Sequence, residues 1–182
     1  DPSIFKGMLT QGFVFYGSLI GGIAGVLLYV RKHKKNFFAL TDLFVPSLAL
    51  AQAVGRVGCH LAGCCYGCET NGALHVIFPE GSGAPAGAPL VPTQLLESAF
   101  LLLLAVLLVY LVTRKKPSGT VLAWYCILYG VWRFFIEFYR NDDRGFVGSL
   151  STSQFIGVFV IAAGVAILVL IRKGVIVSRE TN

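Results

Sequence analysis

Long runs of apolar residues, separated by short polar stretches, form the dominant pattern of this chain. The runs match the roughly 20 apolar residues that a helix needs to cross the hydrocarbon core of a bilayer. The pattern therefore predicts five transmembrane helices, at Gly12 to Val30, Leu40 to Ala62, Pro92 to Val112, Thr120 to Tyr139 and Ser153 to Ile171. With 55% hydrophobic and 13% charged residues, we expect an all-α, polytopic transmembrane bundle that forms one integral membrane domain over residues 1–182.

The basic residues predict the orientation of this bundle. Their clusters fall at every second helix end, so all lie on one side of the membrane: Arg31 to Lys35, Arg114 to Lys116, and Arg172 with Lys173. The positive-inside rule makes that side cytoplasmic, and it accounts for the net charge of +6 without a nucleic-acid partner. The C-terminus is then cytoplasmic, whereas the loop 63–91 is external, in a compartment that permits disulfides.

Two arginines fall within predicted membrane segments, where a central arginine costs about 2.5–3.5 kcal/mol on insertion scales. Arg56 precedes Cys59 on one face of the second predicted helix, near its external end. On the fourth predicted helix, Arg133, Glu137 and Arg140 follow one another at spacings of four and three residues. These spacings align a cation, an anion and a second cation along one stripe.

The positive charge of Arg56 and Arg133 near the outer leaflet predicts a bound anion. A lipid phosphate fits best, because guanidinium groups hold phosphate through paired, charge-assisted hydrogen bonds. Two simpler interpretations stay open. Arg133 and Glu137 can neutralise each other as a structural ion pair, and Arg140, at a helix end, can extend to the external headgroups.

Two other helices place polar residues near the external face. Tyr16 directly precedes a stripe of Gly17, Gly21 and Gly25, which favours close helix packing. Tyr16 fits either an interfacial aromatic or a buried side chain whose hydroxyl faces a polar partner. The third predicted helix opens with VPTQLLE, which puts Thr93, Gln94 and Glu97 in its first turns, near the outer interface. That segment fits either an ordinary helix start or a wall of a headgroup pocket.

A cysteine cluster lies at the external end of the second predicted helix. It contains Cys59, Cys64, Cys65 and Cys68, with His60 among them. The spacing is not a standard zinc pattern, and adjacent cysteines are awkward joint ligands. A disulfide, inert packing between helices and metal ligation all remain open interpretations.

Five segments, in this order along the chain, resemble the prolipoprotein diacylglyceryl transferases of bacterial plasma membranes: GFVFYGSLIGG, TDLFVPSLALAQAVGRVGC, CCYG, VPTQLLE and VWRFFIEFYRNDD. Members of that family normally have seven transmembrane helices, so the resemblance implies that this chain begins just before the third. It also implies an enzyme without a cofactor. Such an enzyme moves a diacylglyceryl group from phosphatidylglycerol, a membrane lipid, to the lipobox cysteine of a preprolipoprotein signal peptide, on the outer-leaflet side.

The resemblance also implies roles for individual residues. Arg56 and Arg133 match the family's two important arginines, which would hold phosphatidylglycerol and stabilise the departing phosphate. Glu137 matches the acidic residue that orients the second arginine, and Tyr16 stands at a catalytic position where the best-known members have a histidine. We expect the substrate-binding residues to be Gly55, Gly58, Gly67, Gln94 and Arg140.

The chain departs from the family pattern at several polar positions. Cys59 and Cys64 replace an asparagine and a glutamate of the best-known members, and Val91 replaces a histidine. These departures support an alternative hypothesis: a non-catalytic or thiol- or metal-active membrane protein on the same scaffold.

Overall fold

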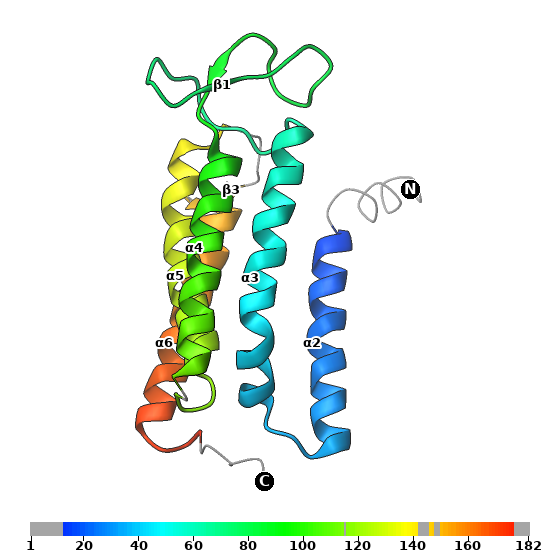
Figure 1. Cartoon of the computed structure of the whole chain (residues 1–182), viewed down its shortest axis with the longest axis vertical. Coiled ribbons are helices and arrows are strands. Elements are labelled where there is room, and N and C mark those ends of the chain that lie inside the picture. The colour runs from blue at the N-terminus through cyan, green and yellow to red at the C-terminus, as the bar shows by residue number, and fades with distance from the viewer. Residues whose placement is uncertain (1–12, 115, 142–145, 148–149, 177–182) are drawn as a thin grey trace.

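Five helices run along the long axis of the molecule in the part of the chain that the structure describes (Figure 1). The structure is a computed structural model that describes residues 13–114, 116–141, 146–147 and 150–176; the side chains of residues 13–20, 146–147 and 150 lie outside this description. The helices are α2 (Phe13–His33), α3 (Phe37–Leu61), α4 (Thr93–Thr113), α5 (Thr120–Ile136) and α6 (Thr152–Arg172).

These helices confirm the all-α bundle that the apolar runs predict. Their ends differ from the predicted ends by three residues or fewer, as where α3 begins at Phe37 instead of Leu40. The fourth predicted helix ends as a 3₁₀ turn, η1 (Glu137–Tyr139), directly after α5. Within the described residues, α3, α4, α6 and the continuous α5 with η1 are long and apolar enough to cross a membrane.

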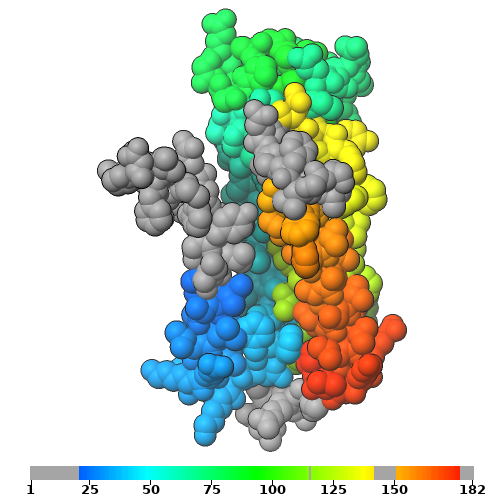
Figure 2. All heavy atoms as spheres, turned by 180° about the vertical axis from the view of Figure 1, so that it is seen from behind, coloured from blue at the N-terminus to red at the C-terminus, as the bar shows by residue number. Residues whose placement is uncertain are grey.

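The outer surface of the bundle is apolar. Each helix carries at least one large apolar residue that is more than half exposed, for example Leu28, Val54, Leu103, Phe135 and Phe159. Water-soluble monomers rarely expose large contiguous apolar patches, so this surface fits a lipid environment. Figure 2 shows the opposite face of the molecule, where α2 and α6 stand on either side of a recessed surface of α3.

The core lies between α3, α4 and α5. Ala49 and Ala53 of α3 are fully buried, and their small side chains allow α4 to approach closely. The Ser98 hydroxyl of α4 donates to the carbonyl of Ala53 at 2.9 Å. The remaining buried side chains of this core are Val45, Leu101, Leu104, Ala105, Leu108, Val121 and Tyr125.

Among the described residues, close glycine packing occurs between α5 and α6. A Cβ atom at Gly130 would lie 2.7 Å from Ile161, and one at Gly164 would lie 2.8 Å from the carbonyl oxygen of Ala123. Cβ atoms at Gly21 and Gly25 would meet nothing within 4 Å. The packing role predicted for this stripe is therefore not seen among the described residues and stays a prediction, because a small-residue stripe permits close approach but does not select a partner.

An acidic side chain of α3 caps the start of α5. The N-cap residue Gly119 offers no side chain, so Asp42 accepts hydrogen bonds from the backbone N–H groups of Gly119 at 2.7 Å and Leu122 at 2.8 Å. A carboxylate at a helix N-terminus satisfies exposed donors and complements the helix dipole. Asp42 therefore joins α3 to α5 at the end of the bundle opposite the loop 63–91 (Figure 1).

The predicted external loop is folded over the end of the bundle. Its strands β1 (Val76–Ile77) and β2 (Pro89–Leu90) pair antiparallel, with Val76 opposite Leu90. Phe78, Ala84 and Leu90 form a small buried core beneath them. A second short ladder, β3 (Phe146–Val147) with β4 (Leu150–Ser151), precedes α6. Apart from these two short ladders, the described fold is helical, as predicted.

Candidate functional site

Glu97, in the second turn of α4, is the centre of a buried charged cluster. Its side chain is only 1% exposed, and its Oε1 lies 3.0 Å from Nη2 of Arg56 in α3. Its Oε2 lies 3.7 Å from Nη1 of Arg133 in α5 and 3.9 Å from Nη1 of Arg140, the residue after η1. One carboxylate thus faces three arginines from different parts of the bundle.

Glu137 connects the same cluster to α6. Its Oε2 accepts a hydrogen bond from Arg133 Nη2 at 3.0 Å, and its Oε1 accepts one from the Ser151 hydroxyl at 2.9 Å. Ser151 is also the N-cap of α6, where it forms a capping box with Gln154. The start of α6 and the orientation of Arg133 are therefore fixed through one carboxylate.

The cluster carries more positive than negative charge. Among the described residues it contains three arginines, Arg56, Arg133 and Arg140, and two carboxylates, Glu97 and Glu137, which leaves one positive charge in excess. The Nη1 atom of Arg133 is buried and makes no hydrogen bond in this part of the chain, because 3.7 Å exceeds hydrogen-bond distance. A buried donor of this kind requires an acceptor.

The structure brings together four of the residues singled out in the sequence: Arg56, Arg133, Glu137 and Arg140. The ion pair between Arg133 and Glu137 is present. Arg140 does not extend to the headgroups, since its side chain is only 3% exposed and lies beside Glu97. The simpler interpretation of Arg140 is therefore wrong.

The sequence placed Glu97 among the polar residues that open the third predicted helix, but its role as the partner of the arginines was missed. The excess charge of two arginines predicted an anion from outside the chain, yet Glu97 supplies one within it. The only signal was a carboxylate in the early turns of an otherwise apolar helix. Its partners could not be read from the sequence, because they come from other helices.

Gln94 holds the loop 63–91 in place. Its side chain is 1% exposed, and its Nε2 donates to the carbonyl oxygen of Cys64 at 2.7 Å. The neighbouring Thr93 hydroxyl donates to the carbonyl oxygen of Cys65 at 2.8 Å. The Oε1 atom of Gln94 is buried without a hydrogen-bond partner in the described residues. A substrate-binding role for Gln94 stays a prediction.

Gly67 lies where no side chain fits. A Cβ atom there would lie 2.6 Å from the carbonyl oxygen of Val91 and 2.8 Å from that of Tyr139. The segment pairs with the end of η1, since Gly67 bridges to Arg140 and Cys68 N–H donates to the Tyr139 carbonyl at 2.8 Å. Gly67 thus positions the backbone of Arg140.

Gly55 and Gly58 differ from Gly67, because Cβ atoms at both would meet nothing within 4 Å. Both glycines flank Arg56, the most exposed of the three clustered arginines, whose side chain is 19% exposed. Their substrate-binding role stays a prediction. Tyr16 belongs to α2, but its side chain lies outside the described residues.

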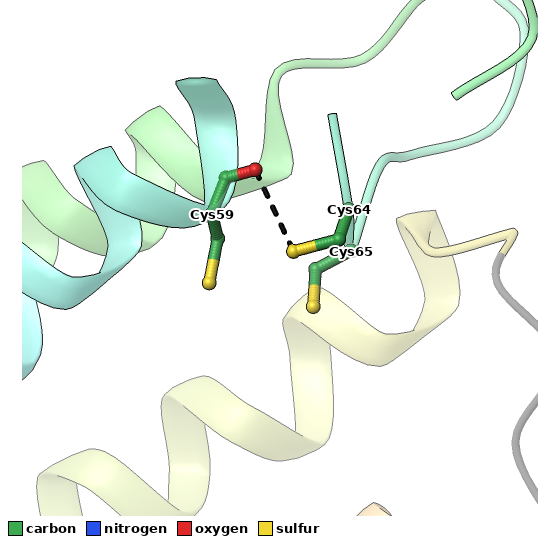
Figure 3. Close-up of side chains that lie close together, drawn as sticks. All are labelled: Cys59, Cys64 and Cys65. Carbon is green, nitrogen blue, oxygen red and sulfur yellow. Dashed lines mark hydrogen bonds between the residues drawn. The ribbon is translucent and has the colours of Figure 1, made fainter. Parts of the chain in front are cut away.

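The cysteines at the end of α3 divide into two sets. The sulfur atoms of Cys59, Cys64 and Cys65 all lie within 4.8 Å of one another (Figure 3), whereas Cys68 and His60 are outside this group. Among the described residues no disulfide joins the cysteines. The His60 ring instead packs against Phe78, with 5.4 Å between ring centroids.

The Cys64 thiol has an altered acidity. Cys64 is exposed as a residue, but partial desolvation of its sulfur, together with the neighbouring Cys65 and Cys59, raises the pKa of the thiol to about 12. In addition, the Cys64 sulfur lies 3.6 Å from the carbonyl oxygen of Cys59, to which its S–H donates (Figure 3). Without a bound cation, this thiol is therefore protonated at neutral pH.

An apolar exterior around a buried arginine–carboxylate cluster defines a polytopic helical membrane protein with a charged site inside the bundle. Comparison with known families is more specific. The family model of prolipoprotein diacylglyceryl transferase matches residues 2–170, and the chain belongs to this family.

Several curated relatives are similar over most of this chain. The phosphatidylglycerol–prolipoprotein diacylglyceryl transferase 2 of Clostridium perfringens is 50% identical over 165 residues, which are 91% of this chain and 64% of the relative. The transferase of Clostridium tetani is 47% identical over 91% of this chain and 66% of its own length. The transferase of Dehalococcoides mccartyi strain 195 is 39% identical over 85% of this chain and 60% of its own length. The chain thus spans slightly less than two thirds of these relatives.

Proposed function

We propose that this protein is a phosphatidylglycerol–prolipoprotein diacylglyceryl transferase and that the arginine cluster binds the lipid phosphate. The observation that carries the proposal is the excess positive charge around Glu97, together with the buried Nη1 of Arg133, which has no hydrogen-bond acceptor among the described residues. A phosphodiester carries one negative charge and several acceptor oxygens, which matches both features. The names of the relatives give phosphatidylglycerol and prolipoprotein as the substrates of those proteins.

The proposed reaction is a displacement at a glycerol carbon. The sulfur of the lipobox cysteine forms a bond to the carbon that carries the phosphate ester, and the carbon–oxygen bond breaks. The electron pair of that bond leaves on the phosphate oxygen, so glycerol phosphate departs. The thiol proton must pass to a base. Tyr16 stands at the catalytic position where the best-known members have a histidine, although a phenol with an ordinary pKa of about 10 is a poor base at neutral pH.

The arginines act on the leaving group in this scheme. Negative charge grows on the phosphate as the bond breaks, and Arg56 and Arg133 stabilise it by charge-assisted hydrogen bonds in a site of low dielectric. Glu137 orients Arg133 through the contact at 3.0 Å. Gly55 and Gly58 leave open space beside Arg56 for the glycerol backbone.

We place the protein in the bacterial plasma membrane, with the charged cluster towards the outer leaflet and the C-terminus in the cytoplasm. In Figure 1 the α2–α3 and α4–α5 connections and the end of α6, which carry the basic clusters, lie at one end of the bundle. The loop 63–91 lies at the other end, next to the cluster. The positive-inside rule makes the basic end cytoplasmic.

The test is release of glycerol phosphate by the full-length protein in proteoliposomes that contain phosphatidylglycerol and a lipobox peptide. Arg56→Ala and Arg133→Ala should each lower the rate by about 10²-fold or more, because one lost donor to a developing anion typically costs that much. Arg114→Ala is the matched control, since Arg114 is exposed beyond the end of α4. Equal rates in all three variants, or no release by the wild type, would contradict the proposal.

The three clustered cysteines favour a second candidate function, a thiol- or metal-active protein on the same scaffold. The same assay separates the two candidates. The second gains only if the wild type releases no glycerol phosphate while the cysteines retain a chemical activity of their own.

A further inference from the structure

Three thiols converge at the external end of α3. Cys59 lies in the last turn of the helix, and Cys64 and Cys65 follow shortly after its end. Figure 3 shows the side chain of Cys64 directed towards Cys59, and the sulfur atoms of Cys59 and Cys65 pointing the same way. All three sulfur atoms lie within 4.8 Å of one another.

This separation is close to that of thiolates sharing one ion. With metal–sulfur distances of about 2.3 Å, sulfurs in a trigonal arrangement are about 4 Å apart. The cysteines therefore need to move by less than about 1 Å to bind the same ion. Rotation of the side chains alone suffices for such a shift.

The backbone turn explains how two adjacent cysteines face the same point. Neighbouring side chains usually diverge, which made Cys64 and Cys65 awkward joint ligands in the sequence. Cys65 adopts a φ of 61°, in the left-handed region that residues other than glycine rarely occupy. Non-glycine residues in this region cluster at functional sites, where the surrounding structure holds them.

Contacts from α4 hold this turn. The carbonyl groups of Cys64 and Cys65 accept hydrogen bonds from Gln94 at 2.7 Å and Thr93 at 2.8 Å. The Cys64 N–H donates to the Cys59 carbonyl at 3.1 Å, so the turn is also tied to the last turn of α3. The three sulfur ligands are therefore largely positioned before any ion binds, which lowers the entropic cost of ligation.

We propose that Cys59, Cys64 and Cys65 form a three-thiolate site for one soft metal ion, of the type of Zn²⁺ or Cu(I). Thiolate ligands select these ions. A zinc site with three protein ligands keeps a fourth position for water or another small ligand, and the exposure of Cys64 leaves room for one. Each thiol gives up its proton on binding, so affinity rises with pH.

The ion would connect two of the helices that form the charged cluster. Cys59 follows Arg56 by three residues on α3, and the Cys64–Cys65 turn is hydrogen-bonded to the start of α4, which carries Glu97. A bound ion therefore restrains the end of α3 next to the contact between Arg56 and Glu97. This inference does not depend on the proposed transferase activity, because it concerns binding alone.

The test is a titration of the reduced, purified full-length protein in lipid nanodiscs. Cd²⁺ serves as the spectroscopic probe through its ultraviolet thiolate-to-metal absorption, and Zn²⁺ and Cu(I) compete with it. The variants are Cys59→Ser, Cys64→Ser and Cys65→Ser. The matched controls are Cys68→Ser in the same loop and Cys126→Ser in α5, whose sulfurs lie outside the group.

We expect one Cd²⁺ per wild-type protein, displaced by Zn²⁺ or Cu(I). Each of the three site variants should lose more than about 100-fold in affinity for Cd²⁺. Loss of a residue that only hydrogen-bonds to a metal ligand already costs about 10–100-fold, and here a ligand itself is lost. Both control variants should bind like the wild type. Circular dichroism of each variant separates loss of a ligand from loss of the fold.

The proposal is overturned by no binding to the wild type, by equal affinity in site and control variants, or by a disulfide within the group in protein digested without reduction. Hydrogen exchange supplies an independent readout. Zn²⁺ should slow exchange of the amides of residues 59–65 in the wild type and in Cys126→Ser, but not in Cys64→Ser. Unchanged exchange in the wild type would also contradict the proposal.

Discussion

Glu97 is the single residue on which the geometry of the charged cluster depends most. It is almost completely buried and faces Arg56, Arg133 and Arg140. A buried ion pair is weak evidence for stability, but removal of one partner leaves an uncompensated charge in a medium of low dielectric. The three arginines would repel one another without Glu97, because only Glu137 would remain to balance them.

We therefore predict that Glu97→Gln destabilises the protein by roughly 3–5 kcal/mol, the usual cost of breaking a buried ion pair. Thermal unfolding in detergent measures the change. Glu80→Gln is the matched control, because Glu80 is exposed in the external loop and its replacement should change stability by less than about 0.5 kcal/mol. Similar effects of the two substitutions would show that Glu97 does not organise the cluster.

The Cys64 thiol gives a prediction of pH dependence. Its pKa is raised to about 12 by partial desolvation and by the neighbouring Cys65 and Cys59, and only the thiolate reacts with iodoacetamide. In metal-free protein, alkylation of Cys64 should therefore be slow at neutral pH and should rise about tenfold per pH unit well beyond pH 9. Mass spectrometry measures this rate.

A cysteine introduced at the exposed position Glu80 is the comparison for this experiment. Its rate should level off near pH 9, close to the ordinary cysteine pKa of about 8.5. The raised pKa also makes the folded state less stable as the pH rises from the unfolded-state pKa towards about 12, because the unfolded chain releases this proton first. A plateau for Cys64 near pH 9 would contradict the prediction.

At the scale of elements, the helices could be predicted because apolar runs of this length have only one stable form in a bilayer. The ion pair of Arg133 and Glu137 could also be predicted, since it lies within one helix. The partners of Glu97 and the capping role of Asp42 could not, because each joins separate helices. Such contacts depend on how the helices assemble, which hydropathy does not specify.

Asp42 provides a test of helix capping. Asp42→Ala removes the acceptors for the N–H groups of Gly119 and Leu122, and we expect a loss of about 1–2 kcal/mol in stability. Asp42→Asn retains one acceptor oxygen, so its stability should lie between those of the wild type and Asp42→Ala. Thr113→Ala is a control with an exposed hydroxyl bonded within its own helix. Thermal unfolding of all three variants measures the order of their stabilities. If Asp42→Ala is no less stable than Thr113→Ala, the capping role is refuted.

The three glycines predicted to bind substrate should respond differently to alanine. Gly67→Ala forces a Cβ atom against two carbonyl oxygens, so we expect a lower melting temperature and a stability loss of about 1–3 kcal/mol, as for other overpacked sites. Gly55→Ala and Gly58→Ala have free space and should leave stability almost unchanged. Under the proposed function they lower transferase activity by obstructing the lipid. The melting temperature and the rate, measured together, separate these effects.

At the scale of the whole molecule, the basic clusters and the loop 63–91 occupy opposite ends of one bundle (Figure 1). Single cysteines introduced into a cysteine-to-serine background test this arrangement. Glu80→Cys should react with a membrane-impermeant maleimide in intact cells, and Lys116→Cys should react only after permeabilisation. Both positions are exposed. Labelling of Lys116→Cys in intact cells would reverse the proposed orientation.

The charge balance of the buried cluster also bears on how a reaction cycle ends. Its described members carry one positive charge in excess, so a lipid phosphodiester with one negative charge makes the occupied site neutral. Under the proposed function, glycerol phosphate leaves as a phosphate monoester of about −1.5 to −2 at neutral pH. The same arginines that hold the lipid would then enclose a net negative charge at low dielectric, which favours escape of the product into water over its retention.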